Sequence, residues 1–233
     1  FMENVRDFVI RKIGGHCNQS PSLELFCSYT CTDGLPIDKS PLYNPKDPFA
    51  NRDPRLAMTI QPFKTKYSAD YAEYEQSKKD GTFPEKYPDY ITLGYEFNLS
   101  PYANTVYEVS TGKMVVNTDS KASNQHSAYN GLILRKFVKD DWKDFNNYNL
   151  KADNCYPYLR YAEVLMTYVE AKNEMGQCTQ DDLDKTINLI RERAYRETGI
   201  AYPRVEVQSQ EALRKIIRMD RRSESVSYTH LTL

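Results

Sequence analysis

The clearest hydrophobic pattern lies near the C-terminal end, where apolar residues recur every three or four positions in two successive segments. In the first segment, up to Gly176, the positions that share one helix face are Leu159, Ala162, Leu165, Met166 and Val169. In the second segment, 179–194, they are Leu183, Ile187, Ile190 and Ala194. Gly176 is a typical helix stop, and Thr179 followed by Asp182 is typical of a capping box. The spacing predicts two amphipathic helices joined by a short turn.

Such a hairpin is the unit of helical-repeat proteins, and one unit cannot bury its apolar faces without neighbouring units. Only one clear copy is visible. A third helix is predicted after a Ser209 cap and ends near Arg222, with the apolar positions Ala212, Leu213, Ile216 and Ile217. We therefore expect marginal stability and an exposed apolar helix face. Residues 225–233 do not continue the pattern, and we interpret them as a tail of non-native sequence.

The N-terminal part shows shorter patterns. Alternating or apolar runs predict strands at 5–13, 56–60, 91–97 and 131–138, whereas 23–29 reads as a helical turn or two and 32–36 as a turn. Residues 40–55 hold several prolines and are expected to form an extended surface strap, anchored by Leu42, Tyr43, Phe49 and Leu56. Residues 61–130 have no sustained period. A long, irregular, aromatic-bearing region of this kind is usually functional.

Composition removes several function classes. The chain has 31 basic and 32 acidic residues among 233, a net charge of -1, which argues against a nucleic-acid binder. No apolar run approaches the roughly 18 residues that a membrane span needs, and no signal peptide is visible. The five cysteines and three histidines show no spacing typical of a zinc site, so inert thiols are expected. No metal or other cofactor is predicted.

Six segments in order along the chain carry recognisable motifs. The most specific are Asn-Arg-Asp-Pro-Arg-Leu at 51–56 and Arg-Tyr-Ala-Glu-Val-Leu at 160–165. The others are Pro-Ser-Leu-Glu-Leu-Phe-Cys-Ser-Tyr at 21–29 with the turn at 32–37, Leu-Arg-Lys-Phe at 134–137, Ile-Asn-Leu-Ile-Arg-Glu-Arg-Ala at 187–194 and Ile-Arg-Met-Asp-Arg-Arg at 217–222. In this order the six segments span residues 21–222, and together they resemble the SusD/RagB family of nutrient-binding outer-membrane lipoproteins.

The resemblance implies a mainly α fold of tetratricopeptide-like helical hairpins, packed with an irregular, loop-rich region that contains a few short strands. Residues 1–224 would be the C-terminal portion of one such domain, with 61–150 as the ligand-loop region and 156–222 as the helical part. The lipid-anchor cysteine and the N-terminal repeats of the family would lie outside this chain. Family members sit on the outward face of the outer membrane and deliver oligosaccharides, or in some members peptides, to a SusC-like TonB-dependent transporter.

Binding a glycan requires an aromatic face that stacks on the sugar ring beside polar groups that bond its hydroxyls. The aromatic candidates in the irregular region or just after it are Trp142, Tyr67, Tyr71, Tyr87, Tyr90 and Tyr95. Trp142, the single tryptophan, lies among charged residues and is the first choice. The resemblance does not identify these residues individually, because ligand loops vary within the family.

An enzyme is not predicted. The chain has many carboxylates, but it lacks a phosphate-binding glycine loop, a GxSxG elbow and an HExxH motif, and no motif marks a glycosidase carboxylate pair. We expect structural roles for Arg160 and Glu163, and for Asn51, Arg52, Asp53 and Arg55. Three functions stay open: oligosaccharide capture, peptide capture by the same architecture, and a helical-repeat adaptor that binds proteins.

Overall fold

The computed structural model describes residues 20–62, 105–108, 113–116, 132–136, 157 and 159–226. The elements in chain order are α1 (Leu23–Ser28), α2 (Pro54–Thr59), β1 (Thr105–Glu108), β2 (Lys113–Val116), α4 (Tyr161–Glu174), α5 (Gln180–Leu183), the π-helical segment η3 (Asp184–Asn188), α6 (Leu189–Tyr195) and α7 (Gln210–Glu224). Residues 24–57 and 157–233 form one compact unit, and residues 1–23 and 58–156 form another. The expected mainly helical fold is confirmed.

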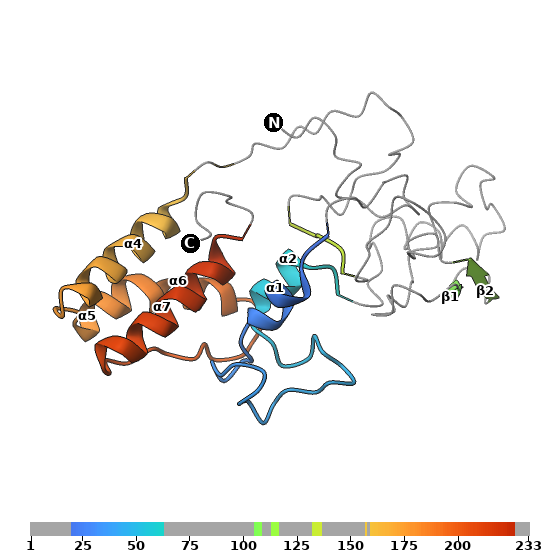
Figure 1. The fold of residues 1–233 in the computed structure, drawn as a ribbon, viewed down its shortest axis with the longest axis horizontal. Coiled ribbons are helices and arrows are strands. Elements are labelled where there is room, and N and C mark those ends of the chain that lie inside the picture. Colours follow the sequence, from blue (N-terminus) through green and yellow to red (C-terminus); the bar gives the residue numbers. More distant parts are fainter. Residues whose placement is uncertain are drawn as a thin grey trace. The chain divides into compact units, whose positions relative to one another are not determined.

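The predicted hairpin of two helices is present as α4 and the α5–η3–α6 helix (Figure 1). Gly176 adopts a φ of +67°, and its N–H donates to the carbonyl of Asn173 at 2.9 Å, which ends α4. The capping box is confirmed: Thr179 Oγ1 accepts the N–H of Asp182, whose carboxylate accepts the N–H of Thr179 at 3.0 Å. Local sequence therefore sets both ends of the turn.

The two helices and α7 share one core, in which α4 packs against both α7 and η3. Its buried members are Ala162, Met166, Val169, Leu183, Ile187, Ile190, Val205, Leu213 and Ile217. Leu159 was placed on the same face but is 66% exposed. It precedes the helix, and the cap residue Arg160 has extended backbone, so helical spacing does not apply to Leu159.

The second helix is not uniform, because residues 184–188 form a π turn. Asn188, the last residue of this turn, uses its side-chain amide to hold the connector between α6 and α7. Its Nδ2 donates to the carbonyl of Val205 at 2.9 Å, and its Oδ1 accepts the N–H of Val205 at 2.8 Å. The Asn188 amide thus makes the two backbone hydrogen bonds that a neighbouring strand would otherwise make with the connector. The apolar spacing predicts one regular helix here, and the π turn is a difference that this spacing does not reveal.

The third helix, α7, begins at the predicted Ser209 cap, whose hydroxyl accepts the N–H of Ala212 at 3.3 Å. It extends to Glu224, two residues beyond the expected end. Ser225 and Val226 follow it and are buried, and Ser225 Oγ donates to Glu163 at 2.9 Å. The first two residues of the expected tail are therefore packed; residues 227–233 lie outside the described part.

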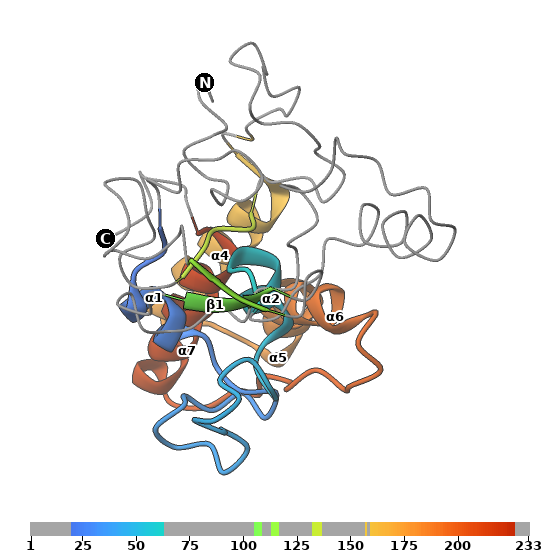
Figure 2. The same cartoon turned by 90° about the vertical axis from the view of Figure 1, so that its right-hand side faces the viewer.

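In the segment from α1 to α2, the predicted helix and turn are confirmed, and the strap is confirmed in part. Figure 2 shows this segment, coloured blue to cyan, leaving α1 and returning to α2. Phe49 packs edge-on against Phe26 with ring centroids 5.2 Å apart, and Leu56 is buried. Leu42 is exposed and is not an anchor; its backbone carbonyl is the contact, because it accepts Asn51 Nδ2 at 3.1 Å.

The predicted strand at 56–60 is wrong, because residues 54–59 form α2. Asp53 Oδ1 accepts the N–H of Arg55 at 2.9 Å, and Pro54 occupies the first helical position. Both are helix-start features. Leu56 and Ile60 are buried whereas Met58 is exposed. The apolar residues Leu56, Met58 and Ile60 follow one another at two-residue steps, which suggested a strand. Leu56 and Ile60 are also four residues apart, which is the spacing of one helix face.

In the other unit, Ile60 and Leu134 form an isolated antiparallel bridge, which is all that 132–136 shows of the predicted strand at 131–138. Strands β1 and β2 pair antiparallel, with Thr105 opposite Val116 and Glu108 opposite Lys113; the sequence analysis missed this hairpin. The predicted strands at 5–13 and 91–97 lie outside the described residues.

Candidate functional site

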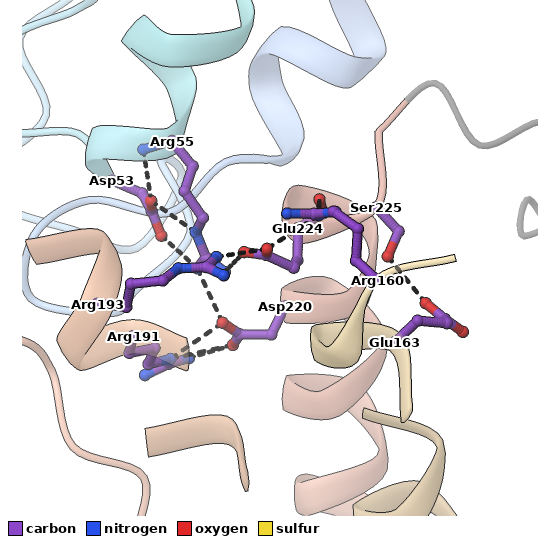
Figure 3. Close-up of polar contacts among 9 residues, drawn as sticks. All are labelled: Asp53, Arg55, Arg160, Glu163, Arg191, Arg193, Asp220, Glu224 and Ser225. Carbon is purple, nitrogen blue, oxygen red and sulfur yellow. Dashed lines mark hydrogen bonds and ion pairs between the residues drawn. The ribbon is translucent and has the colours of Figure 1, made fainter. Parts of the chain in front are cut away.

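All six residues proposed for glycan binding lie outside the described part of the chain: Trp142, Tyr67, Tyr71, Tyr87, Tyr90 and Tyr95. Their grouping into one site stays a prediction. What the structure does show is how the unit of residues 24–57 and 157–233, the helical unit, holds its charged residues. Asp53 and Arg55, which the sequence singled out, form a buried ion-pair cluster with Arg191, Asp220 and Glu224 (Figure 3).

Arg55 is the centre of the buried ion-pair cluster. Its Nε and Nη2 donate to the two carboxylate oxygens of Asp53 at 2.9 and 2.6 Å, a bidentate pair. Nη2 also donates to Asp220 Oδ1 at 2.8 Å, and Nη1 lies 3.6 Å from Glu224 Oε2. Burial alone would lower the pKa of Arg55, but the charges of Asp53 and Asp220 outweigh burial and raise it.

Asp220 comes from α7 and joins two arginines. Arg191 Nε lies 3.1 Å from each carboxylate oxygen, its Nη2 donates to Oδ2, and Arg55 donates from the other side. Burial favours the neutral acid, yet the charges of Arg55 and Arg191 hold the pKa of Asp220 below its ordinary value. Asp220 is therefore ionised at neutral pH.

Glu224, one turn beyond Asp220, accepts from arginines of three other segments. Arg160 Nη2 lies 3.0 Å from Oε1, Arg193 Nη2 donates to the same oxygen, and Arg55 approaches Oε2. Burial opposes ionisation, but the hydrogen bond from Arg193 and the charges of the arginines lower the pKa of Glu224. The carboxylates of Asp220 and Glu224 thus join four segments: the start of α2, the start of α4, α6 and the end of α7.

A second group of ion pairs joins α4 to α7. Arg221 donates to both Glu163 and Glu170, and Glu163 also accepts from Ser225. The structural roles expected for Arg160 and Glu163 are therefore confirmed. Both side chains are occupied by contacts that join the ends of α4 and α7.

The structural role expected for Arg52 is confirmed, because it holds the strap through hydrogen bonds to backbone carbonyls. It is buried, and its Nη atoms donate to the carbonyls of Pro48, Phe26 and Tyr29 at 2.9, 2.7 and 3.0 Å. Its guanidinium lies 5.0 Å from the Phe26 ring centroid and 5.6 Å from that of Tyr43. Desolvation lowers its pKa. This arginine ties α1 to the strap.

These arrangements support the fold and offer no acid–base pair. Both carboxylates of the cluster whose pKa is lowered are ionised at neutral pH, and guanidinium groups do not donate protons to substrates. Within the described ranges, no group of His, Cys, Asp and Glu side chains could hold a metal ion. Three described cysteines, Cys27, Cys31 and Cys178, are free thiols, and burial raises the pKa of Cys178.

Sequence reasoning missed Arg191, Asp220 and Glu224 as partners of Arg55. A signal was present, because Asp220 and Glu224 continue the spacing of Leu213 and Ile217 on the buried face of α7. A charge in register with an apolar stripe needs a buried counter-charge. The sequence could not say which arginine supplies it.

Comparison with known proteins agrees with the resemblance seen in the sequence. A sequence model of the SusD family matches residues 7–226. A SusD-like carbohydrate-binding protein from Bacteroides fragilis NCTC 9343 is similar at 28% identity and a TM-score of 0.61, covering 91% of this chain and 34% of that one. A second SusD-like protein from the same strain shares the fold at 18% identity and a TM-score of 0.55, covering 93% and 35%.

The chain spans about a third of the length of these two relatives. No curated protein matches it. Among the helices that the structure describes, none is both long and apolar enough to cross a membrane.

Proposed function

This chain belongs to the SusD family, and on that basis we propose that it captures oligosaccharides at the outer surface of the outer membrane and delivers them, chemically unchanged, to a SusC-like TonB-dependent transporter. The observation that carries the proposal is the similarity to a SusD-like carbohydrate-binding protein over 91% of the chain. Attachment to the membrane would be through a lipid anchor.

We place the binding function in the region 61–150 rather than in the helices. The charged residues of the helical unit pair with one another, because each carboxylate of the buried ion-pair cluster contacts at least one arginine. Sugar recognition needs aromatic faces and unpaired polar groups. The proposed site residues are therefore Trp142 with Tyr67, Tyr71, Tyr87, Tyr90 and Tyr95.

The direct test is binding of a panel of soluble oligosaccharides by the full-length protein, measured by calorimetry, with the products analysed by chromatography. We expect saturable binding of at least one glycan and no shorter products. Trp142→Ala is expected to weaken that binding at least about tenfold, because one stacked aromatic face is lost. Tyr202→Ala, which removes a half-buried tyrosine of the helical unit, is the control and should leave it unchanged.

Other outcomes would redirect the assignment. Shorter oligosaccharides appearing with time would refute a non-catalytic role. Binding of peptide mixtures, with no binding of any glycan, would favour peptide capture by the same architecture. Binding of neither, together with capture of a protein partner, would favour the adaptor function.

A further inference from the structure

The connector between α6 and α7 is held along one side of its backbone by side chains of the second helix. Asn188 bonds both the N–H and the carbonyl of Val205. Gln180 bonds two residues, because its Nε2 donates to the Val205 carbonyl at 3.1 Å and its Oε1 accepts the N–H of Val207 at 3.0 Å. A side chain of α6, that of Arg191, donates to one more carbonyl. The backbone groups bonded from this side belong to every second residue, as along one edge of a β-strand: Pro203, Val205 and Val207.

The residues between these positions face the other way. Val205 is 3% exposed and belongs to the core, whereas the side chains of Arg204 and Glu206 are 46% and 76% exposed. In an extended segment, neighbouring residues direct their side chains to opposite faces and their backbone groups to opposite edges. The N–H and carbonyl groups of residues 204 and 206 therefore lie along the other edge of the connector, which we call the outer edge. Within the described part of the chain, the contact made there is that of Gln208 Nε2, 3.5 Å from the Glu206 carbonyl.

An unpaired strand edge is a template for a further strand, and the charges along it decide which strand fits. Side chains of one sign would repel a second copy, but the outer edge carries one charge of each sign. When two copies pair antiparallel about a two-fold axis centred on Val205, Arg204 of each copy lies opposite Glu206 of the other. Opposite charges directly across two strands are stabilising. The outer edge is therefore complementary to itself.

We propose that the outer edge, residues 204–206, is a self-association site at which a second copy of this chain adds its own connector as an antiparallel strand. In this register, Arg204 of one copy and Glu206 of the other exchange both of their backbone hydrogen bonds and also form an ion pair. A peptide of unrelated sequence would make the backbone bonds without the ion pairs, so it is the poorer occupant. The proposal goes beyond glycan capture and does not depend on it.

The association should be weak and reversible. So short an edge is expected to bury less than the about 1,200 Å² at which stable complexes begin, so dimerisation depends on concentration. Within its own chain, Arg204 donates to Asp184 at 2.7 Å and lies 3.7 Å from Glu206. Contacts between exposed charges contribute little in water, so a second copy does not have to displace a strong existing pair.

The test is sedimentation equilibrium of the full-length protein over a series of concentrations. We expect the average mass to rise toward that of a dimer as concentration increases, and to fall when salt is added. Glu206→Arg and Arg204→Glu each place like charges opposite one another, so each should weaken dimerisation at least about tenfold. Glu192→Arg, the same reversal at an exposed position of α6, is the matched control and should leave dimerisation unchanged.

A mixture of the two reversed proteins gives the sharpest measurement. Each of them repels its own kind, but the Arg204→Glu protein has an acidic outer edge and the Glu206→Arg protein has a basic one. An equal mixture should therefore dimerise about as well as the wild-type protein. Arg204→Glu removes an exposed pair with Asp184, which contributes little to stability, and circular dichroism confirms that both variants are folded before they are mixed.

A mass that stays monomeric at every concentration would overturn the proposal. So would a dimer that neither reversal weakens, because another surface would then form it, and so would a mixture of the reversed proteins that does not associate. Binding of an extended peptide by a protein that never self-associates would assign the outer edge to that ligand instead. Glycan binding enters none of these measurements, so its failure would not be mistaken for failure of the self-association site.

Discussion

Replacing Asp220 by asparagine tests whether the buried ion-pair cluster holds the helical unit together. The substitution keeps the shape of the side chain but removes its charge, so that Arg55 and Arg191 lose the carboxylate they share. Asp220 is 3% exposed, and water therefore cannot replace it. Breaking a buried pair by removing one partner costs about 3 to 5 kcal/mol. At about 2 to 4 °C per kcal/mol for a chain of this size, Tm should fall by roughly 10 °C.

The assay is urea unfolding followed by circular dichroism, with wild type and variant compared at pH 7. Asp181→Asn is the matched control, because Asp181 is 70% exposed and pairs with Lys185 across one helical turn; it should change stability by less than about 0.5 kcal/mol. Asp220→Asn combined with Arg191→Met should lose less than the sum of the single losses.

A loss below about 1 kcal/mol for Asp220→Asn would refute the reasoning, since the charge would then contribute no more than a surface pair. Strict additivity of the two substitutions would also contradict it, because Arg191 would not be interacting with Asp220 in the way the distances indicate.

Three further predictions concern local devices. The pKa of Asp182 is lowered to about 2, mainly by the hydrogen bond from Thr179. The ionised carboxylate therefore contributes stability that is fully present above its ordinary pKa of 3.8 and is lost as the pH falls toward 2. Asp182→Asn should reduce the fall of Tm between about pH 4 and pH 2, and an unchanged dependence of Tm on pH in that range would speak against this role. Gly34→Ala should lower the free energy of unfolding in urea by about 1 to 3 kcal/mol, more than Gly199→Ala does. Both glycines have positive φ, but only at Gly34 would an added Cβ lie 2.9 Å from the Cβ of Pro203. Asn188→Ala removes both hydrogen bonds to the α6–α7 connector and should speed tryptic cleavage there, whereas an unchanged cleavage rate would show that the connector is held by other contacts.

Helices were predictable where short-range signals agree. The capping box at Thr179, the glycine stop at 176 and the stripe of Leu183 and Ile187 all lie within a few residues of one another, and each was confirmed. The strand predicted at 56–60 failed because an apolar pattern of two-residue steps also contains four-residue steps. Asp53 and Pro54 mark a helix start there, a local signal that competes with the alternation.

The sequence by itself determined the helical hairpin, its caps and the family, because capping groups and apolar stripes act between residues three or four positions apart and six ordered segments carry the resemblance. Only the tertiary structure decided how the buried charges are partnered. Arg55 and Asp220 are 165 residues apart in sequence, yet they form one hydrogen bond of 2.8 Å. Any of several arginines could have neutralised Asp220, since charge alone does not select a partner. The tertiary fold makes that selection, because it brings the start of α2, α6 and α7 together at Asp220.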